Sequence, residues 1–156
     1  MNEIVFMRHG TALSVREAGV ASDSQRPLSP LGEKQALLSA RHLRDSGFSP
    51  ALIISSPYTR AARTAEIAAG VFPAARLRTA AEISDGPADA VLDLATDAAK
   101  SGSVLIVGHI PMLGAAAGAL LAAPPPDLSP AGFVHLRPGE AAASLVEFYS
   151  PEGKSC

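Results

Sequence analysis

Cysteine is almost absent from the sequence: of 156 residues, Cys156 alone is a cysteine. A disulfide within the chain is therefore impossible, and metal sites built from several cysteines are excluded. Trp is absent and aromatic residues make up only 4%, so we expect a core of Ala, Leu, Val and Ile. Hydrophobic residues still reach 47%, which is enough for the core of one domain spanning residues 1–156.

Long hydrophobic runs and an excess of positive charge are also missing. The longest nearly unbroken apolar stretch, from Met112 to Ala123, is about half of what a membrane span needs. The first residues lack both the basic start and the long apolar run of a signal peptide. A net charge of -2 argues against binding to nucleic acid or to a membrane surface. We therefore expect a cytoplasmic protein that binds neither.

The charges that are present are unevenly distributed along the chain. Residues 1–78 hold ten Lys/Arg and six Asp/Glu, whereas residues 79–156 hold three and nine. Ten of the thirteen basic residues are Arg, the side chain best suited to forked recognition of phosphate or carboxylate. An ordinary solvated surface can show the same asymmetry. The asymmetry therefore indicates a preference for anions only when the positions of the arginines are considered as well.

Short apolar runs alternate with segments of helical periodicity. We expect strands over residues 3–7, 51–55, 104–107, 133–137 and 144–149, a short strand around Leu77, and helices over 30–46, 58–69, from Pro87 onward and to about Ala122. This alternation predicts an α/β fold, a three-layer α/β/α sandwich with a mostly parallel central sheet. The segment from Thr11 to Leu28 has no period, and a loop that long is usually functional or mobile.

Polar clusters follow three of the expected strands directly. They are Arg8-His9-Gly10, Ser55-Ser56-Pro57-Tyr58-Thr59-Arg60 and Gly108-His109. Ligands of open α/β sheets bind beyond the carboxyl ends of the strands. The pattern therefore predicts that two His and two Arg meet at one edge of the sheet.

Such a cluster favours a compact anion with several oxygens, and phosphate fits best. A metal ion fits poorly, because Arg beside the imidazoles repels a cation and no two His have metal-ligand spacing. A P-loop is absent, and no Gly-x-Gly-x-x-Gly follows the first strand, so we expect neither a metal nor a cofactor. Neutral imidazole is a competent nucleophile near pH 7, which makes His9 a candidate to attack phosphorus.

Four segments together resemble the histidine phosphatase superfamily, also called the phosphoglycerate mutase-like family. In the order of that family they are Met7-Arg8-His9-Gly10, Arg26-Pro27-Leu28-Ser29-x-x-Gly32, Ser56-Pro57-x-x-Arg60-Ala61-x-x-Thr64-Ala65 and Val107-Gly108-His109-x-Pro111. The short chain and the Asp23-x-x-Arg26-Pro27-Leu28 spacing are most similar to the SixA-type phosphohistidine phosphatases. The resemblance implies a phosphoglycerate mutase-like fold.

The resemblance also implies a role for each matched residue. His9 would attack phosphorus and carry the phosphoryl group, and Arg8 and Arg60 would hold its equatorial oxygens. His109 would donate to a further oxygen in the transition state, and Gly10 would let the backbone turn sharply and approach the substrate. Larger members of the family use a Glu between the second and third motifs as general acid, and Glu82 and Asp85 both fall in the matching region here. Glu82 is equally well interpreted as a surface residue.

The remaining polar residues near these motifs have mainly structural interpretations. Asp85 is expected to cap the helix that starts at Pro87. Arg26 is expected to clamp the long loop through Asp23 or to reach the substrate, the former being favoured. Arg63 is expected to face solvent, one helical turn beyond Arg60. His42 and His135 are expected to be structural residues.

The sequence and the resemblance lead to one preferred function and two alternatives. The preferred one is a metal-independent phosphatase that forms a phosphohistidine intermediate and dephosphorylates phosphohistidine on a signalling protein. The first alternative keeps this chemistry for small phosphate esters. The second is a non-catalytic module that binds phosphate or a phosphoprotein.

Overall fold

The computed structural model describes residues 2–151, which build one six-stranded sheet; Cys156 lies outside these residues. The strands lie in the order β3 (Arg76–Thr79), β2 (Leu52–Ser55), β4 (Val104–Gly108), β1 (Ile4–Arg8), β5 (Phe133–Arg137) and β6 (Ser144–Tyr149). The first four strands run parallel, and β5 and β6 join antiparallel. The predicted mostly parallel sheet is confirmed.

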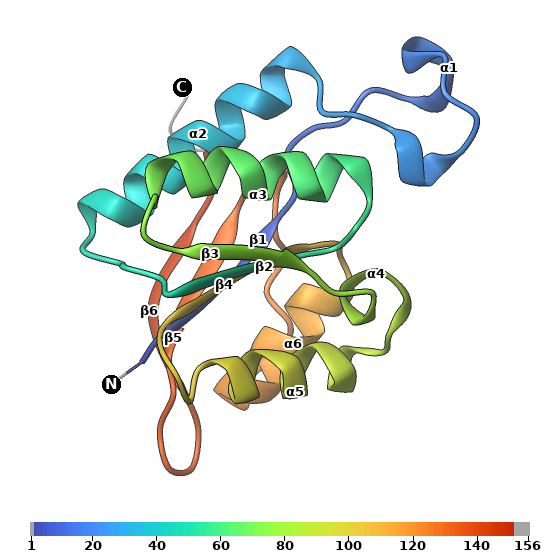
Figure 1. The fold of residues 1–156 in the computed structure, drawn as a ribbon. Helices are drawn as coiled ribbons and strands as arrows, with labels where there is room; N and C mark the ends of the chain where they lie inside the picture. Colours follow the sequence, from blue (N-terminus) through green and yellow to red (C-terminus); the bar gives the residue numbers. More distant parts are fainter. Residues whose placement is uncertain (1, 152–156) are drawn as a thin grey trace.

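Helices cover both faces of this sheet, as Figure 1 shows. On one face lie α2 (Pro30–Asp45) and α3 (Thr59–Val71), and on the other lie α4 (Glu82–Asp85), α5 (Ala88–Ala98) and α6 (Met112–Leu121). Strand residues alternate between two apolar clusters: Val5 packs with α2 and α3, whereas Ile4 packs with α5 and α6. The expected three-layer α/β/α sandwich is therefore confirmed.

The start of α2 matters for the site because it abuts the segment after β1. Ser29 caps the helix by accepting a hydrogen bond from the Gly32 N–H at 3.0 Å, with Pro30 at the first helical position, as the sequence predicts. The helix ends at Asp45, and Gly47 follows with φ +93°. Helix α3 runs two residues further than expected, to Val71, with Gly70 inside it.

Two short helical turns interrupt the segment 11–28, where the sequence predicts none. The first is α1 (Val15–Ala18), whose N-cap Ser14 and Glu17 exchange hydrogen bonds between side chain and backbone. The second is a 3-10 turn over Asp23–Gln25. A helix of one turn is too short to show a recurring pattern of apolar residues and depends on its caps instead. The spacing of apolar residues therefore does not reveal these two turns.

The prediction that Asp85 caps the helix starting at Pro87 is wrong. Pro87 occupies the N-cap of α5, with no hydrogen bond from a side chain. Asp85 is instead the last residue of α4, a separate turn that the sequence did not predict. A residue that ends one helix is not in the extended backbone conformation that an N-cap requires, and here two residues separate it from α5.

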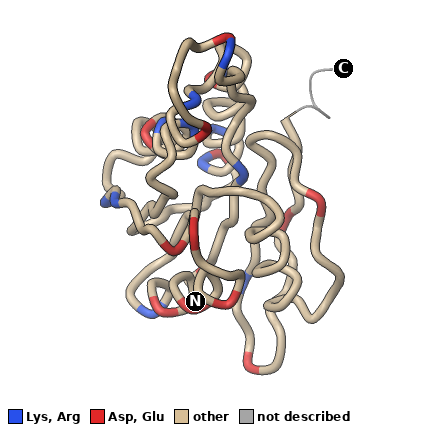
Figure 2. The backbone as a smooth tube through the Cα atoms, turned by 90° about the vertical axis from the view of Figure 1, so that its right-hand side faces the viewer, with Lys and Arg blue, Asp and Glu red and all other residues tan. Residues whose placement is uncertain are grey.

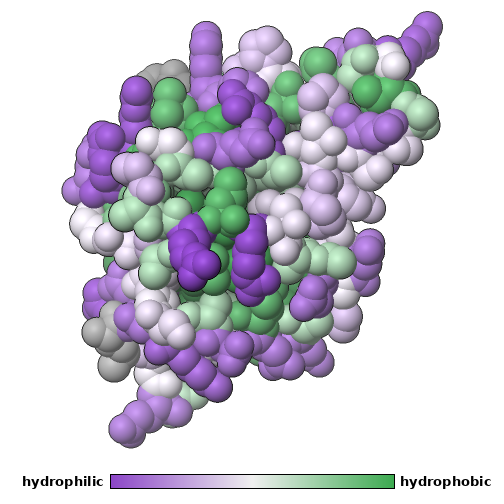
Figure 3. Space-filling view, viewed as in Figure 1, coloured by the Kyte–Doolittle hydropathy of each residue, from purple (hydrophilic) through white to green (hydrophobic). Residues whose placement is uncertain are grey.

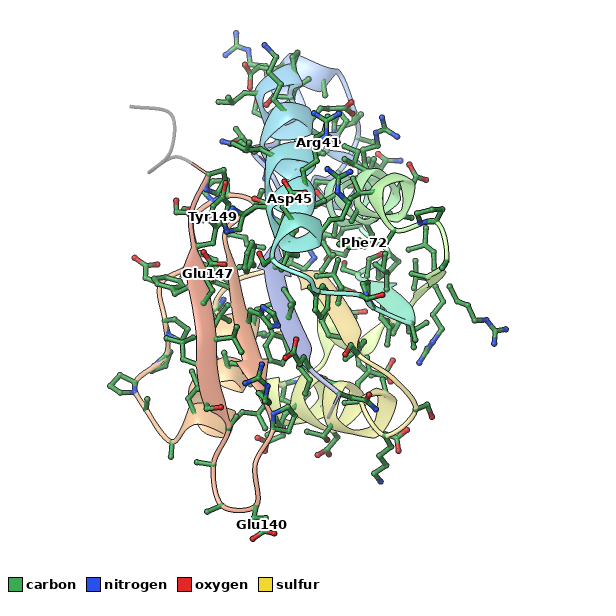
Figure 4. The ribbon with its side chains drawn as sticks, turned by 90° about the vertical axis from the view of Figure 1, so that its left-hand side faces the viewer. Arg41, Asp45, Phe72, Glu140, Glu147 and Tyr149 are labelled. Carbon is green, nitrogen blue, oxygen red and sulfur yellow. The ribbon has the colours of Figure 1, made fainter. Side chains whose placement is uncertain are left out.

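The other two histidines are structural, as expected. His42 on α2 lies 2.8 Å from Glu147 Oε2 and stacks on Tyr149, and Figure 4 shows both partners on β6 beside α2. His135 is buried on β5, with its Nε2 atom 2.7 Å from Glu3 Oε1. Both therefore serve the packing of the sheet.

Charged and hydrophobic residues both reach the surface of the described chain. Charged residues of both signs crowd the end that carries α1 and the start of α2 (Figure 2). The face formed by the edge strand β3, whose four residues are all exposed, carries hydrophilic side chains on either side of a hydrophobic strip (Figure 3). Among the described helices, none combines the length and apolar character needed to cross a membrane.

Candidate active site

The three polar clusters meet at the carboxyl ends of β1, β2 and β4, as the sequence predicts. The backbone fixes this meeting, because the His9 N–H donates to the Gly108 carbonyl and the Ser56 N–H to the Val107 carbonyl, both at 3.0 Å. Together with the segment 11–28 they surround a hollow of about 400 Å³. Its lining consists of Arg8, His9, Gly10, Thr11, Ala12, Arg26, Arg60, His109, Ile110 and Pro130.

His9 is held in one orientation by its own neighbour. Its Nδ1 atom lies 2.7 Å from the carbonyl oxygen of Gly10, which can only accept, so Nδ1 carries the proton. The lone pair then resides on Nε2, toward which Arg60 Nε donates at 3.3 Å. Burial lowers the pKa of His9 to about 4, and the charges of His109 and the arginines act in the same direction. His9 is therefore neutral at neutral pH, with the electron pair of Nε2 facing Arg60 Nε.

Gly10 is required by close packing rather than by an unusual backbone angle. The positive-φ glycines of the described chain are Gly19 and Gly47, so the sharp turn expected at Gly10 does not occur through the left-handed region. A Cβ atom on Gly10 would instead lie 2.6 Å from the carbonyl oxygen of Gly32, at the start of α2. The Gly10 N–H donates to Thr64 Oγ1 at 3.2 Å, which fixes the backbone below His9.

Arg60 is buried, and its guanidinium is held from two sides. Besides the contact with His9, it donates to the Asp23 backbone carbonyl at 2.7 Å and to Asp23 Oδ2 at 3.1 Å. The guanidinium carbon also lies 5.1 Å from the centre of the Tyr58 ring. These contacts fix a forked cation against the His9 ring.

His109 lies across the hollow from His9, with 5.3 Å between the ring centres. Its Nε2 atom is 2.8 Å from Ser56 Oγ, which also accepts from the Tyr58 N–H at 3.1 Å. Burial, followed by the charge of Arg60, lowers the pKa of His109 to about 4. A bound phosphate dianion would oppose this effect, because it favours the protonated ring.

Arg8 and Arg26 complete the positive lining. Arg8 ends β1 and donates from NH1 to the Leu128 carbonyl at 3.0 Å, which ties it to the segment before β5. Arg26 donates from Nε to the Leu13 carbonyl at 2.8 Å and from NH1 to Asp23 Oδ1 at 3.0 Å. The expected clamping role of Arg26 is therefore confirmed, although its side chain also lines the hollow.

Two residues near the motifs lie away from this hollow. Glu82 is exposed and lines a separate hollow along α5, because its neighbour Ile83 is the residue of α4 that packs inward, against Gly108. Glu82 is therefore not among the residues that line the hollow of the two histidines. Arg63 faces outward as expected, and its Nε donates to Glu33 Oε2 at 2.9 Å.

Sequence reasoning missed two partners of the site. The sequence predicts a contact of Asp23 with Arg26 but not the hydrogen bond that Asp23 also accepts from Arg60. It places Ser56 in a motif but does not predict the contact of its hydroxyl with His109. The Ser56-Pro57 pair directly after a buried strand is the signal that could have placed this hydroxyl at the sheet edge. Within residues 2–151, no group of three or more His, Cys, Asp and Glu side chains could hold a metal ion.

Comparison with known proteins agrees with this geometry. Residues 4–86 match the family described as the histidine phosphatase superfamily (branch 1). The chain belongs to this superfamily. An uncharacterized protein of Picosynechococcus sp. is 36% identical over 146 residues, which cover 89% of this chain and 87% of that protein. The family assignment makes the protein a phosphatase.

The fold is similar to that of SixA-type phosphatases. The candidate phosphohistidine phosphatase SixA of Agrobacterium tumefaciens matches with a TM-score of 0.83 at 24% identity, over 96% of this chain and 98% of that one. A protein histidine phosphatase SixA in complex with tungstate matches with a TM-score of 0.83 at 24% identity, over 98% and 99%. The mycobacterial glucosyl-3-phosphoglycerate phosphatase is more distant, with a TM-score of 0.74 at 19% identity over 96% and 100%.

Proposed function

We propose that this phosphatase works without a metal, forms phosphohistidine on His9, and removes phosphoryl groups from phosphohistidine on a protein. The observation that supports the nucleophile is the 2.7 Å distance between His9 Nδ1 and the Gly10 carbonyl oxygen, which assigns the ring proton to Nδ1. This hydrogen bond leaves Nε2 unprotonated inside a hollow lined by Arg8, Arg26 and Arg60. A neutral nucleophile in a cationic pocket is the combination that attack on a phosphate dianion requires.

In the first step, the Nε2 electron pair of His9 forms a bond to phosphorus while the bond to the leaving atom breaks. The leaving atom takes the electron pair of that bond. Arg8 and Arg60 hold the oxygens of the transferring group, and His109 donates to an oxygen once the bound dianion has raised its pKa. The imidazole of His9 becomes positively charged, and the Gly10 carbonyl stabilises the N–H of that ring.

In the second step, water attacks phosphorus on the side opposite His9 Nε2. The P–N bond breaks, its electron pair returns to Nε2, and both protons of the water remain on the released dihydrogen phosphate. The Nδ1 proton of His9 stays on the ring through both steps, so no further base is required at this nitrogen. The hydrogen bond to Gly10 thus serves the nucleophile and the leaving group in turn.

The need for a general acid distinguishes a phosphoramidate substrate from a phosphate ester. An imidazole that is protonated on its second nitrogen leaves as a neutral ring and needs no general acid, whereas an alkoxide needs one. Glu82, which the family resemblance suggests as a general acid, is exposed and lines a different hollow. The similarity of the fold to proteins named protein histidine phosphatase supports the same substrate class.

The experiment measures phosphoryl release from a histidine-phosphorylated protein and from p-nitrophenyl phosphate, with EDTA present. We expect the wild type to act on the phosphoprotein with undiminished rate in EDTA, and His9→Ala to be inactive. Glu140→Gln, in the hairpin between β5 and β6 labelled in Figure 4, is the matched surface control. Release from the small ester alone would instead favour the small-ester alternative. Binding of phosphate without release from either substrate would favour the binding module.

A further inference from the structure

Asp23 connects two of the arginines that line the hollow. Its Oδ1 atom accepts from Arg26 NH1 at 3.0 Å, and its Oδ2 atom accepts from Arg60 NH2 at 3.1 Å. Its backbone carbonyl accepts a further hydrogen bond from Arg60 NH1 at 2.7 Å. The turn over Asp23–Gln25 therefore brings a carboxylate from the segment 11–28 to the rim of the active site.

This carboxylate is charged and open to solvent. The side chain of Asp23 is 59% exposed, compared with 9% for Arg60. The hydrogen bonds from Arg26 and Arg60 hold the pKa of Asp23 below its usual value. The charge also reaches the interior of the site, because it partly offsets the lowering of the His109 pKa. A fixed negative charge thus lies directly beside two of the arginines that line the hollow.

Positioning Arg60 alone does not need this charge. The backbone carbonyl of Asp23 already anchors one nitrogen of Arg60, and the single oxygen of an asparagine at position 23 would still accept from the other, although the hydrogen bond from Arg26 would be lost. What only a carboxylate adds is an electrostatic preference. It attracts a substrate that is positively charged next to its phosphoryl group, and it repels one that is negatively charged there.

We propose that Asp23 is a specificity-determining residue that selects substrates with a positive charge next to the phosphoryl group over substrates with a negative charge there. A phosphoryl imidazole protonated on its second nitrogen is the leading member of the favoured class. In its reaction the P–N bond breaks, the imidazole nitrogen takes the electron pair, and the phosphoryl group moves to His9 Nε2. The carboxylate stabilises the protonated ring until that bond breaks.

This inference rests on the phosphatase function but is tested separately from its substrate. Three small substrates are compared in the wild type and in Asp23→Asn: phosphoimidazole, phosphocholine and phosphoglycolate. The measured quantity is kcat/KM for each compound that is turned over. For a compound that is not turned over, the inhibition constant is measured instead. The last two are both esters and differ in the charge beside the phosphoryl group. Use of phosphoimidazole by the wild type tests the proposed function, whereas the ratio of phosphocholine to phosphoglycolate tests the selectivity.

The Asp23→Asn substitution should lower the preference for phosphocholine over phosphoglycolate by about tenfold, as expected for one fixed charge at short range. The change should shrink at high salt, because exposed charges are screened. Asp45→Asn is the matched control: Asp45 also pairs with an arginine, at 3.2 Å, but at the far end of α2. Figure 4 labels this residue.

Two results would overturn the proposal. One is an equal loss for all three compounds, which is the signature of a residue that only positions Arg60. The other is a ratio of phosphocholine to phosphoglycolate that stays unchanged without any loss of activity. A wild type that does not act on phosphoimidazole but whose ester ratio shifts in Asp23→Asn would contradict the proposed substrate and still support the selectivity. Unchanged thermal unfolding of Asp23→Asn shows that the comparison concerns folded protein.

Discussion

His9 Nδ1 and the carbonyl oxygen of Gly10, the next residue in the chain, lie 2.7 Å apart. This contact determines which nitrogen of the His9 ring is protonated, because the carbonyl oxygen can only accept a hydrogen bond. The position of Gly10 is set in turn by its contact with Gly32 on α2. The packing of α2 therefore acts directly on His9, the proposed nucleophile.

Substituting Gly10 by Ala should damage catalysis through this packing. The new Cβ would meet the Gly32 carbonyl at 2.6 Å, so the backbone must shift, at a cost of about 1–3 kcal/mol in the free energy of unfolding. Because the shift displaces His9, we expect kcat to fall by at least about tenfold. Steady-state kinetics and urea unfolding check both effects. Gly70→Ala, where nothing lies within 4 Å, is the control, and equal kinetics for the two variants would contradict this account.

Replacing Arg60 by Lys should reduce kcat/KM by about 100-fold, as removal of one donor to a developing anion does elsewhere. A lysine keeps the charge but loses the fork that contacts His9 and Asp23 together. The matched control is Arg63→Lys, one turn later on α3, whose arginine pairs with exposed Glu33. We expect that variant to stay within about twofold of the wild type. Similar losses in both variants would show that the fork is unimportant.

The hydroxyl of Ser56 should tune His109. Ser56→Ala removes the partner 2.8 Å from His109 Nε2 and leaves a buried ring nitrogen without it, a loss of about 1–3 kcal/mol. We expect kcat to fall by about tenfold and the ¹⁵N shifts of the His109 ring to report a changed tautomer balance. Ser84→Ala, whose hydroxyl bonds only the carbonyl of Ala81 in the same turn, is the control. Unchanged ring shifts in Ser56→Ala would rule out this role.

The two active-site histidines should make stability depend on pH. Burial lowers the pKa of His9 and of His109 to about 4, whereas both titrate near 6.5 when unfolded. Between these values the unfolded chain binds protons that the folded chain does not. The stabilisation is therefore complete above about pH 6.5 and is lost as the pH falls toward 4, by at most about 3 kcal/mol for each histidine.

Urea unfolding of the wild type and of His109→Gln at several pH values between 4 and 7.5 measures this effect. The variant should show a shallower decrease in the free energy of unfolding over the acidic range. Added phosphate should reduce the decrease for the wild type, because the bound anion favours the protonated rings. Parallel pH profiles for the two proteins would contradict the assigned shift of His109.

The sequence predicts the architecture and most of the site for clear physical reasons. Buried apolar runs such as Val104–Val107 identify the parallel strands, and polar residues placed just after them must meet at one sheet edge. Ser29 and Pro30 mark the start of α2 without any knowledge of tertiary contacts. These local signals are enough to bring His9, Arg60 and His109 together.

Features that depend on contacts between distant segments are not predicted. The link from Asp23 to Arg60 spans 37 positions and arises from a single turn inside an aperiodic loop. The direction of Glu82 depends on which residue of a four-residue helix packs inward, and Ile83 takes that place. The need for glycine at position 10 comes from the approach of α2, which no local pattern reveals.

The most direct test of the account is to trap the covalent intermediate. Rapid acid-free quenching of the wild type during turnover of a histidine-phosphorylated protein, followed by peptide mass spectrometry, locates any phosphoryl group on the enzyme. We expect an acid-labile phosphoryl group on His9, absent from His9→Ala, because the Gly10 carbonyl leaves only Nε2 free to attack. Turnover without any phosphoenzyme, or a phosphoryl group on another residue, would contradict it.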